Sequence, residues 1–372
     1  MPRAVGIDFG TTKTIVSRYN SRTDQAETIL LPGYDSAPVP TTISVADNRF
    51  LFGNDAEDDV VLHPLDYCRG FKLSLGRNDA IVGGLNAKQL TGRFLRVLRE
   101  ICSERGFIDD EKVEDVVITI PVAFSPAQIQ ELRDAAKDAG FNRVETLMEP
   151  EAAGRAYLKE QGGRLPGRKV LVIDWGGGTV DVAVLTIGDT IQCDPENASG
   201  DDSVGGDAID RKLWDSIQKR FRDEHGMKIP TSRGEIPGYL RDVEKAKKKL
   251  DSKDFIDFYA RGESLKKIRL SRVEFENLAQ GFVIKVVQKI RRVIDPLPVE
   301  HKPDAILLIG GTCRMPLVKK AIKDALTDVY YSIEFENDPE VATAPAHEIV
   351  ITDQLDGTKF DLSTFTPTRV EI

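Results

Sequence analysis

Short apolar runs and longer amphipathic stretches alternate along this chain, and they predict strands and helices respectively. Residues 116–120, 182–187 and 305–309 are runs rich in valine, isoleucine and leucine, which is typical of strands. In residues 88–105, apolar side chains instead recur every three or four positions, as they do on one face of a helix. A second long helix is predicted over residues 272–294, after a compact strand-like segment.

The clearest helix boundaries lie on either side of residues 126–139. Ser125 has a side chain suited to an N-cap, and Gln128 completes the pattern of a capping box. Pro126 fits the first helical position, where its missing N–H costs nothing. Gly140 is placed to end the helix, because glycine tolerates the left-handed conformation of a C-terminal cap.

One strand–turn–strand pattern occurs twice, at residues 5–16 and 172–183. In each copy a β-branched strand runs into an aspartate, Asp8 or Asp174, and then into a turn of glycine and threonine. The turn residues are Gly10, Thr11, Thr12 and Lys13 in the first copy and Gly176, Gly177, Gly178 and Thr179 in the second. The duplication predicts two topologically similar halves, each a mixed sheet flanked by helices.

These turns have the chemistry of a phosphate site. Glycines let backbone N–H groups approach an anion closely, and the threonine hydroxyls add further donors. An aspartate at the end of the first strand suits Mg²⁺, which prefers oxygen ligands and keeps several waters. Two such turns that face each other would hold a nucleoside triphosphate between two lobes.

Other glycine-rich motifs fit these turns less well. A P-loop requires the pattern G-x-x-x-x-G-K-[ST] at the start of a helix, and neither turn has it. A dinucleotide-binding fingerprint requires a third small residue before a helix. Here that position is Asp181, and residues 182–187 after it predict a strand.

Composition narrows the remaining classes. At 372 residues, with 41% hydrophobic and 30% charged residues, the chain is typical of a globular protein with a sizeable core. The net charge of −9 gives no electrostatic reason to expect a nucleic-acid partner, and no apolar stretch suggests a membrane span. Residues 1–4 lead directly into the first strand, so we expect no signal peptide. The dispersed cysteines and histidines argue against disulfide or zinc frameworks and predict a cytoplasmic location.

Several separately placed motifs resemble one protein family. The two loops resemble the phosphate motifs of the actin, sugar kinase and heat-shock superfamily. Further segments are similar to the nucleotide-binding domain of the seventy-kilodalton heat-shock chaperones, and the resemblance runs from residue 4 to about residue 348. These segments are residues 71–77, 118–124, 147–153, 203–207, 243–250 and 308–316.

The resemblance implies an α/β protein with the actin-like ATPase fold: a duplicated ribonuclease-H-like core with a nucleotide cleft between two lobes. Lobe I would span residues 1–166, with a reduced outer part at about 40–112. Lobe II would span residues 167–348, with an outer part at about 207–285, and residues 164–168 would mark the boundary between the lobes. Residues 349–372 would form a tail, with no peptide-binding domain after it.

The resemblance also implies roles for individual residues. Lys72 matches the family's catalytic lysine, and Glu149 and Thr179 match residues that orient the attacking water or the metal shell. Asp8 and Asp174 would hold Mg²⁺ through water. The two loops, with Gly205 and Gly206, would bind the phosphates of ATP or ADP. The adenosine would be bound by Glu244, Lys247, Lys248, Gly310, Gly311, Thr312 and Arg314.

The sequence also departs from the family pattern. The segment between Arg77 and Lys88 is short, and residues 252–271 form a trimmed hairpin region, so the outer surfaces offered to co-chaperones are reduced. A helix that begins near Asp338 contains Pro345, which would kink or shorten it. Protein clients or co-chaperones would therefore act through a separate partner.

The resemblance leaves more than one function open. The first hypothesis is a slow, Mg²⁺-dependent ATPase of the heat-shock type, whose lobes close on ATP and relax after hydrolysis. The second is an actin-like scaffold that uses ATP to control polymerisation. A nucleotide sensor with little hydrolysis and a sugar or acetate kinase are further alternatives, although no acceptor-site signature is apparent in the sequence.

Overall fold

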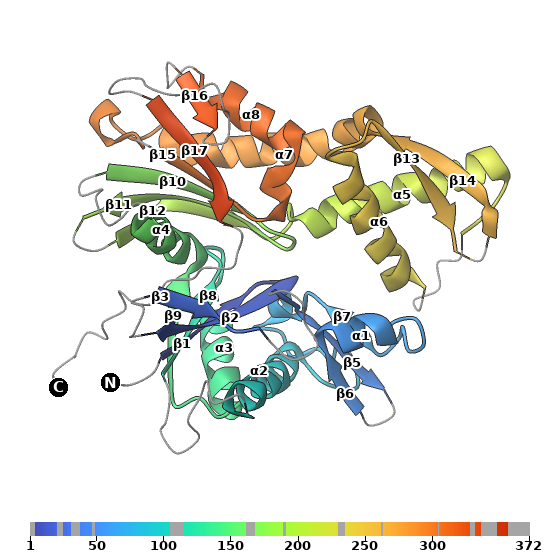
Figure 1. Cartoon of the computed structure of the whole chain (residues 1–372), viewed down its shortest axis with the longest axis horizontal. Helices are drawn as coiled ribbons and strands as arrows, with labels where there is room; N and C mark the ends of the chain where they lie inside the picture. The colour runs from blue at the N-terminus through green and yellow to red at the C-terminus, as the bar shows by residue number, and fades with distance from the viewer. Residues whose placement is uncertain are drawn as a thin grey trace.

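The computed structural model describes residues 4–20, 25–30, 38–46, 49–104, 115–160, 168–188, 191–229, 235–261, 263–303, 305–327, 332–335 and 348–355. Two six-stranded mixed sheets lie at the centres of two halves, drawn one below the other in Figure 1. A smaller outer part lies beside each sheet on the same side of the molecule (Figure 1).

The first sheet has the strand order β3-β2-β1-β8-β9, with β4 paired to the start of β2. Its strands are β1 (Ala4–Phe9), β2 (Lys13–Asn20), β3 (Gln25–Thr28), β4 (Val39–Pro40), β8 (Asp115–Ile120) and β9 (Arg143–Met148). Strands β1 and β2 form an antiparallel hairpin, whereas β1, β8 and β9 run parallel.

The second sheet repeats this arrangement in the order β12-β11-β10-β15-β17-β16. Its strands are β10 (Arg168–Trp175), β11 (Val180–Ile187), β12 (Ile191–Asp201), β15 (Ala305–Ile309), β16 (Ser332–Phe335) and β17 (Glu348–Leu355). Again the first two strands form an antiparallel hairpin, and the first strand pairs in parallel with a strand far along the chain. The predicted duplication of a mixed sheet is therefore confirmed.

Eight helices occur among the described residues, and those expected over residues 88–105, 126–139 and 272–294 are confirmed as α2, α3 and α7. The eight helices are α1 (Gly53–Asp59), α2 (Ala87–Glu104), α3 (Pro126–Asp138), α4 (Glu149–Glu160), α5 (Gly206–His225), α6 (Ile236–Leu250), α7 (Arg272–Ile294) and α8 (Pro316–Leu326). Short 3₁₀ helices are η1 (Phe71–Ser74), η2 (Val299–His301) and η3 (Gly311–Arg314). The capping box of Ser125 and Gln128 is present at the start of α3, and Gly140 has a positive φ of 100° just beyond its end.

Strand β10 is buried on both faces, which explains why its sequence is a continuous apolar run rather than an alternating one. Leu171 and Ile173 belong to the core beneath α5, α6, α7 and α8, whereas Val170 and Val172 pack with α4. Helix α4 also contacts β8 and β9 of the first sheet, so it lies between the two sheets (Figure 1). Its first residue, Glu149, is placed at this junction.

The outer parts are small. Beside the first sheet, β5 (Thr42–Ala46), β6 (Arg49–Phe52) and β7 (Tyr67–Arg69) form a three-stranded sheet that packs against α1. Beside the second, β13 (Phe255–Ala260) and β14 (Glu263–Ser271) form an antiparallel pair next to α5 and α6. This pair accounts for the trimmed hairpin region of the sequence.

Three predicted features fall partly or wholly outside the described residues. Of the lobe boundary at residues 164–168, the structure describes only residue 168. The helix expected to begin near Asp338 falls outside the described residues. The division into lobes at residues 166 and 348 stays a prediction. Of the expected tail, the structure describes residues 349–355, which belong to β17 between β15 and β16 of the second sheet. Within the described part of the chain, no helix combines the length and apolar character needed to cross a membrane.

Two helical glycines lead to opposite predictions for the stability of the fold. A Cβ atom at Gly154 of α4 would lie 2.3 Å from Cδ1 of the buried Leu185, whereas one at Gly281 of α7 would meet nothing within 4 Å. We expect Gly154→Ala to lower the free energy of unfolding by about 1–3 kcal/mol through overpacking. Gly281→Ala should raise it by about 0.5–1 kcal/mol, because alanine favours the helix.

Urea unfolding of both variants beside the parent protein measures the two changes. Equal effects of the two substitutions would contradict the packing of α4 between the sheets.

Candidate functional site

The two repeated loops face each other. A Cβ atom at Gly177 would lie 2.3 Å from Cγ2 of Thr12, and one at Gly178 would lie 2.4 Å from Cγ2 of Thr11. Real Cβ atoms do not approach other atoms so closely, so the loop between β10 and β11 reaches the loop between β1 and β2 only because it consists of glycine. The paired-loop arrangement expected from the sequence is therefore present.

A third segment, residues 205–207 at the start of α5, contacts the backbone of the second loop. The N–H of Gly206 donates to the carbonyl of Gly176 at 3.0 Å, and the N–H of Asp207 donates to the carbonyl of Gly177 at 2.7 Å. Gly205 is the N-cap residue of α5, and its position for a Cβ atom is occupied by the backbone of Gly177 and Gly178. The start of α5, with the partial positive charge of a helix N-terminus, therefore packs directly on the loop.

Lys72 lies at the centre of a group of carboxylates. Its Nζ donates to Oε1 of Glu149 at 2.8 Å, and the lysine side chain is fully buried. The ammonium group also lies 5.6 Å from the ring centroid of Phe9 and 5.4 Å from that of Phe124, within range of cation–π attraction. The 3₁₀ helix η1 carries Lys72 to this point, and α4 carries Glu149.

Three aspartates complete this group, and all come from strands. Asp8 lies in β1 and accepts a hydrogen bond from the hydroxyl of Thr119 at 2.8 Å. Asp174 in β10 pairs in register with Asp181 in β11. Asp181 accepts a hydrogen bond from the backbone N–H of Val122 at 2.8 Å, and its second oxygen is buried with no hydrogen-bond partner among the described residues.

Burial and mutual repulsion favour the neutral forms of these aspartates. Burial, followed by the charge of Glu149, raises the pKa of Asp8 to about 7. The same two causes raise the pKa of Asp181 to about 8, and they hold the pKa of Asp174 well above its usual range. Lys72 opposes the shift at all three aspartates. The site therefore carries more carboxylate than one lysine can neutralise.

A cation near these aspartates would favour their ionised forms and offset their mutual repulsion. Within the described ranges, no group of three or more histidine, cysteine, aspartate or glutamate side chains is arranged to hold a metal ion. Mg²⁺ commonly keeps several of its waters and takes only one or two carboxylates from the protein. The donor set is thus compatible with Mg²⁺ bound through water by Asp8 and Asp174.

The raised pKa values predict how stability changes with pH in the protein free of nucleotide and metal. The folded state keeps protons on Asp8 and Asp181 up to about pH 7 and pH 8, whereas the unfolded chain loses them near pH 4. The folded state therefore binds more protons in this window, so the free energy of unfolding should fall as pH rises through it.

Urea unfolding across this pH window, with Asp8→Asn and Asp181→Asn for comparison, measures the effect. The free energy of unfolding of each asparagine variant should fall less steeply with rising pH than that of the parent protein. A parent stability that rises with pH, or a fall that both variants retain in full, would contradict the prediction.

Two of the residues predicted for the adenosine, Thr312 and Lys247, lie beside the second loop and the start of α5. Thr312 donates from its hydroxyl to the carbonyl of Gly176 at 3.0 Å, so η3 packs against the loop. Lys247 is buried, and its Nζ donates to Oδ2 of Asp210 at 2.9 Å and to the carbonyl of Gly206 at 3.2 Å. Gly310 has a φ of 85°, and a Cβ there would collide with the carbonyl of Trp175.

Ion pairs join the outer parts of the two halves. Arg69 in β7 contacts Asp207 at 3.0 Å and Glu244 at 3.5 Å. Arg241 in α6 donates to the carbonyl of Glu57 at 2.7 Å and lies 3.7 Å from its carboxylate. Burial by itself would raise the pKa of Glu244, but the charge of Arg69 and the hydrogen bond from Lys248 lower this pKa to about 2. Glu244 is therefore a fixed negative charge between the halves.

Most of the predicted site residues come together, but not all. The structure groups Asp8, Lys72, Glu149 and Asp174, and it brings Thr11 and Thr12 to the second loop. Thr179 is buried at the end of that loop, where its carbonyl accepts from Gly176. By contrast, the side chains of Lys13, Lys248 and Arg314 are exposed, and Gly311 is exposed with open space around it. A contact with nucleotide stays a prediction for these four, as it does for the other site residues.

Four residues of this arrangement were not predicted from the sequence: Thr119, Asp181, Asp210 and Arg69. Asp181 had a visible signal, since it is a charged residue inside the apolar run of β11. The others had none, because threonine, aspartate and arginine on strands and helices are most often solvated. Their partners lie 37 to 138 positions away along the chain.

A family model described as "Hsp70 protein" matches residues 79–367, which is more than half of the chain. The chain belongs to the Hsp70 family. The match includes the second loop, Glu149, the start of α5, α6 and η3, whereas the first loop and Lys72 precede it. Those two features are instead supported by the packing of the first loop against the second and by the burial of Lys72 beside Glu149.

Membership of the Hsp70 family identifies the fold as the actin-like ATPase fold. It also identifies the chain as an ATP-binding domain of the chaperone type. This assignment agrees with three features of the structure: the duplicated sheets, the loops that face each other and the helix between the sheets.

Proposed function

We propose that this Hsp70 domain hydrolyses ATP slowly in a Mg²⁺-dependent reaction and that its two lobes close on the nucleotide. The observation that carries the proposal is the buried Lys72–Glu149 pair, which lies with Asp8 and Asp174 beside the two loops. A fully buried lysine among surplus carboxylates costs stability unless a ligand uses the arrangement. Mg²⁺ bound with the triphosphate would supply positive charge beside the aspartates, and the phosphates would give the lysine a further acceptor.

Each group has a distinct role in this proposal. The backbone N–H groups of Gly10 to Lys13 and of Gly177 to Thr179, with the hydroxyls of Thr11 and Thr12, would bind the phosphates, and Gly176 would close the second loop through its bond to Thr179. Gly205 and Gly206 would support the second loop at the start of α5. Bound Mg²⁺ would neutralise charge that develops on the transferred phosphoryl group. Asp8 and Asp174 would hold the waters of that ion.

Lys72, Glu149 and Thr179 would act on the reacting groups. The ammonium of Lys72 would stabilise negative charge on the γ-phosphate as the bond to the leaving group breaks. The carboxylate of Glu149, held in place by Lys72, would accept a hydrogen bond from the attacking water and so orient it. Thr179 would hold water or phosphate at the end of the loop.

The adenosine would lie between α6 and η3. Lys247, Glu244, Lys248, Gly310, Gly311, Thr312 and Arg314 remain the proposed contacts. Because Lys247 already bonds Asp210 and Gly206, we propose that it acts as a rigid support whose remaining N–H faces the ribose.

Closure of the lobes is supported by the contacts of Arg69 and Arg241 across the two outer parts. These contacts must break if the outer parts separate, so their free energy favours the closed form. A nucleotide that touches both loops would shift the equilibrium in the same direction. Protein clients or co-chaperones reached through a separate partner, and a cytoplasmic location, also remain proposals.

Single-turnover hydrolysis of γ-labelled ATP by the purified chain, with Mg²⁺ and with a chelator, tests the proposal. Release of labelled phosphate only with Mg²⁺ is the expected result. Sedimentation with and without ATP separates this function from the actin-like scaffold, which would pellet with ATP. Tight binding of ATP without hydrolysis or sedimentation would instead identify a nucleotide sensor and contradict the proposed reaction.

A further inference from the structure

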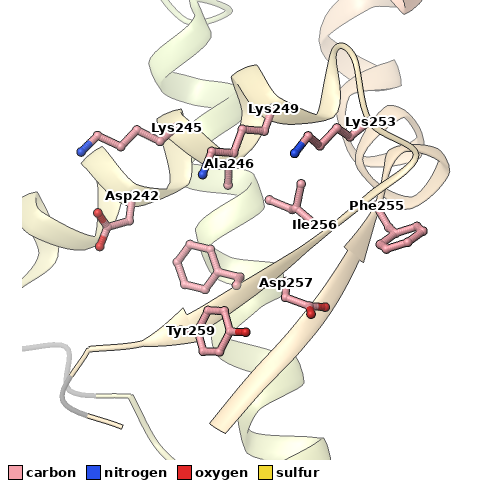
Figure 2. A pocket seen from close by; sticks show the side chains of 10 residues that line it. Asp242, Lys245, Ala246, Lys249, Lys253, Phe255, Ile256, Asp257 and Tyr259 are labelled. Atoms are coloured by element: carbon pink, nitrogen blue, oxygen red, sulfur yellow. The ribbon is translucent and has the colours of Figure 1, made fainter. Parts of the chain in front are cut away.

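A groove with an excess of positive charge lies between α6 and β13, on the outer part of the second half (Figure 2). Its volume is about 490 Å³, and it is open to solvent. Lys245, Lys249 and Lys253 line it on the helix side, and Phe255, Asp257 and Tyr259 line it on the strand side.

The three lysines form one row. They are spaced at four-residue intervals, which places them on the same side of a helix. The backbone continues the helical turn beyond α6, because the N–H of Lys253 donates to the carbonyl of Lys249 at 3.1 Å. At a rise of about 1.5 Å per residue, the row is about 12 Å long.

The lysines are not neutralised by the acidic residues of the groove. Asp242 is paired with Arg261 at 2.8 Å, and Asp257 is paired with both Lys267 and Arg269. No ion pair joins any of the three lysines to a carboxylate of the described residues, and all three are exposed. In a chain with a net charge of −9, this is a local surplus of positive charge.

The strand side of the groove adds exposed apolar area. Phe255 is 53% exposed and Tyr259 is 50% exposed, values that are unusual for aromatic side chains on a strand. Each ring is covered on one face by a cation: Arg269 lies 4.4 Å from the centroid of Phe255, and Lys267 lies 5.9 Å from that of Tyr259. The rings are thus held in place for a ligand.

Lysines with aromatic rings could in principle bind either single-stranded nucleic acid or an acidic peptide, and two observations favour the peptide. The row of lysines matches only about four residues of an extended peptide at about 3.3 Å each. A phosphate backbone would continue past this row onto the surface of a chain with net charge −9, where it would be repelled.

We propose that this groove binds a short acidic segment of a partner protein, with carboxylates on the lysine row and separate apolar side chains against Phe255 and Tyr259. The groove does not depend on the proposed ATPase activity, since none of the residues that line it belongs to the nucleotide site. Helix α6 nevertheless contributes residues to the groove and to the proposed nucleotide site. Lys245 and Lys249 line the groove, whereas Lys247 bonds Asp210.

Fluorescence anisotropy of a labelled peptide with alternating glutamate and leucine residues tests the proposal at about 0.15 M salt, where long-range attraction is screened. The groove variant is Lys245→Glu with Lys249→Glu. The matched control is Lys219→Glu with Lys285→Glu, which changes the net charge equally at two exposed lysines of α5 and α7. All four sites are exposed, so both variants should fold, and thermal unfolding checks this.

We expect the groove variant to bind the peptide at least about 10-fold more weakly and the control to bind within about twofold of the parent protein. Tyr259→Ala should weaken binding of this peptide but not of an all-glutamate peptide. Three results would overturn the proposal: no binding to the parent protein, an equal loss in both charge variants, or preferential binding of a labelled oligouridylate of equal length.

Discussion

Replacement of Lys72 by alanine should reduce the single-turnover rate of ATP hydrolysis by at least about 100-fold while ATP still binds. Lys72 is the cation that faces Asp8, Asp174 and Asp181 and bonds Glu149. Its loss removes the donor proposed to stabilise charge on the γ-phosphate, and it frees Glu149 to move. ATP affinity should change much less, because the two loops contribute most of the proposed phosphate contacts.

The experiment measures release of labelled phosphate under single-turnover conditions and ATP binding by calorimetry on the same samples. Because Lys72 is fully buried, Lys72→Met is a second variant that keeps the length of the side chain and avoids a cavity. Glu149→Gln keeps the lysine and removes only the negative charge of its partner. A Lys72→Met protein that folds, binds ATP and hydrolyses it at the parent rate would show that Lys72 has only a structural role.

Replacement of Gly205 by alanine should weaken nucleotide binding by at least about 10-fold and lower the free energy of unfolding by about 1–3 kcal/mol. A Cβ atom there would lie 2.3 Å from the carbonyl oxygen of Gly177 and 2.4 Å from the carbonyl carbon of Gly178. These are backbone atoms, so no change of rotamer relieves the collision. The second loop or the start of α5 must move, and both belong to the proposed phosphate site.

Equilibrium binding of a fluorescent ADP analogue measures the affinity, and urea unfolding measures the stability. Gly281→Ala is the matched control, since it adds the same methyl group to a glycine with open space around it. A Gly205→Ala protein with unchanged nucleotide affinity would contradict the role assigned to the start of α5.

Local patterns predicted the helices and strands of this protein well. The helix expected over residues 272–294 is α7, which begins after a capping box of Ser271 and Glu274. The apolar run at residues 305–309 is β15, a strand buried in the second sheet. Such features depend on side chains within a few positions of one another, so the sequence around them contains the necessary information.

The candidate site was predicted in part. The repeated loop identified Asp8 and Asp174 because glycine, threonine and aspartate at fixed spacing have few other uses. The partners of these residues were not predictable in the same way. Asp181 bonds Val122, 59 positions away, and Arg69 bonds Asp207, 138 positions away. β17, expected to begin a tail, is paired on both sides within the second sheet.

By itself the sequence determined the elements, the duplicated loop and the kind of ligand that such a loop binds, because these depend on local backbone conformation and on the chemistry of adjacent residues. Only the tertiary structure showed that Lys72 is the buried cation facing several carboxylates and that α6 separates the nucleotide side from a lysine-lined groove. Burial, charge balance and contacts between distant segments arise when the two halves pack together. They are properties of the assembled fold rather than of any one segment.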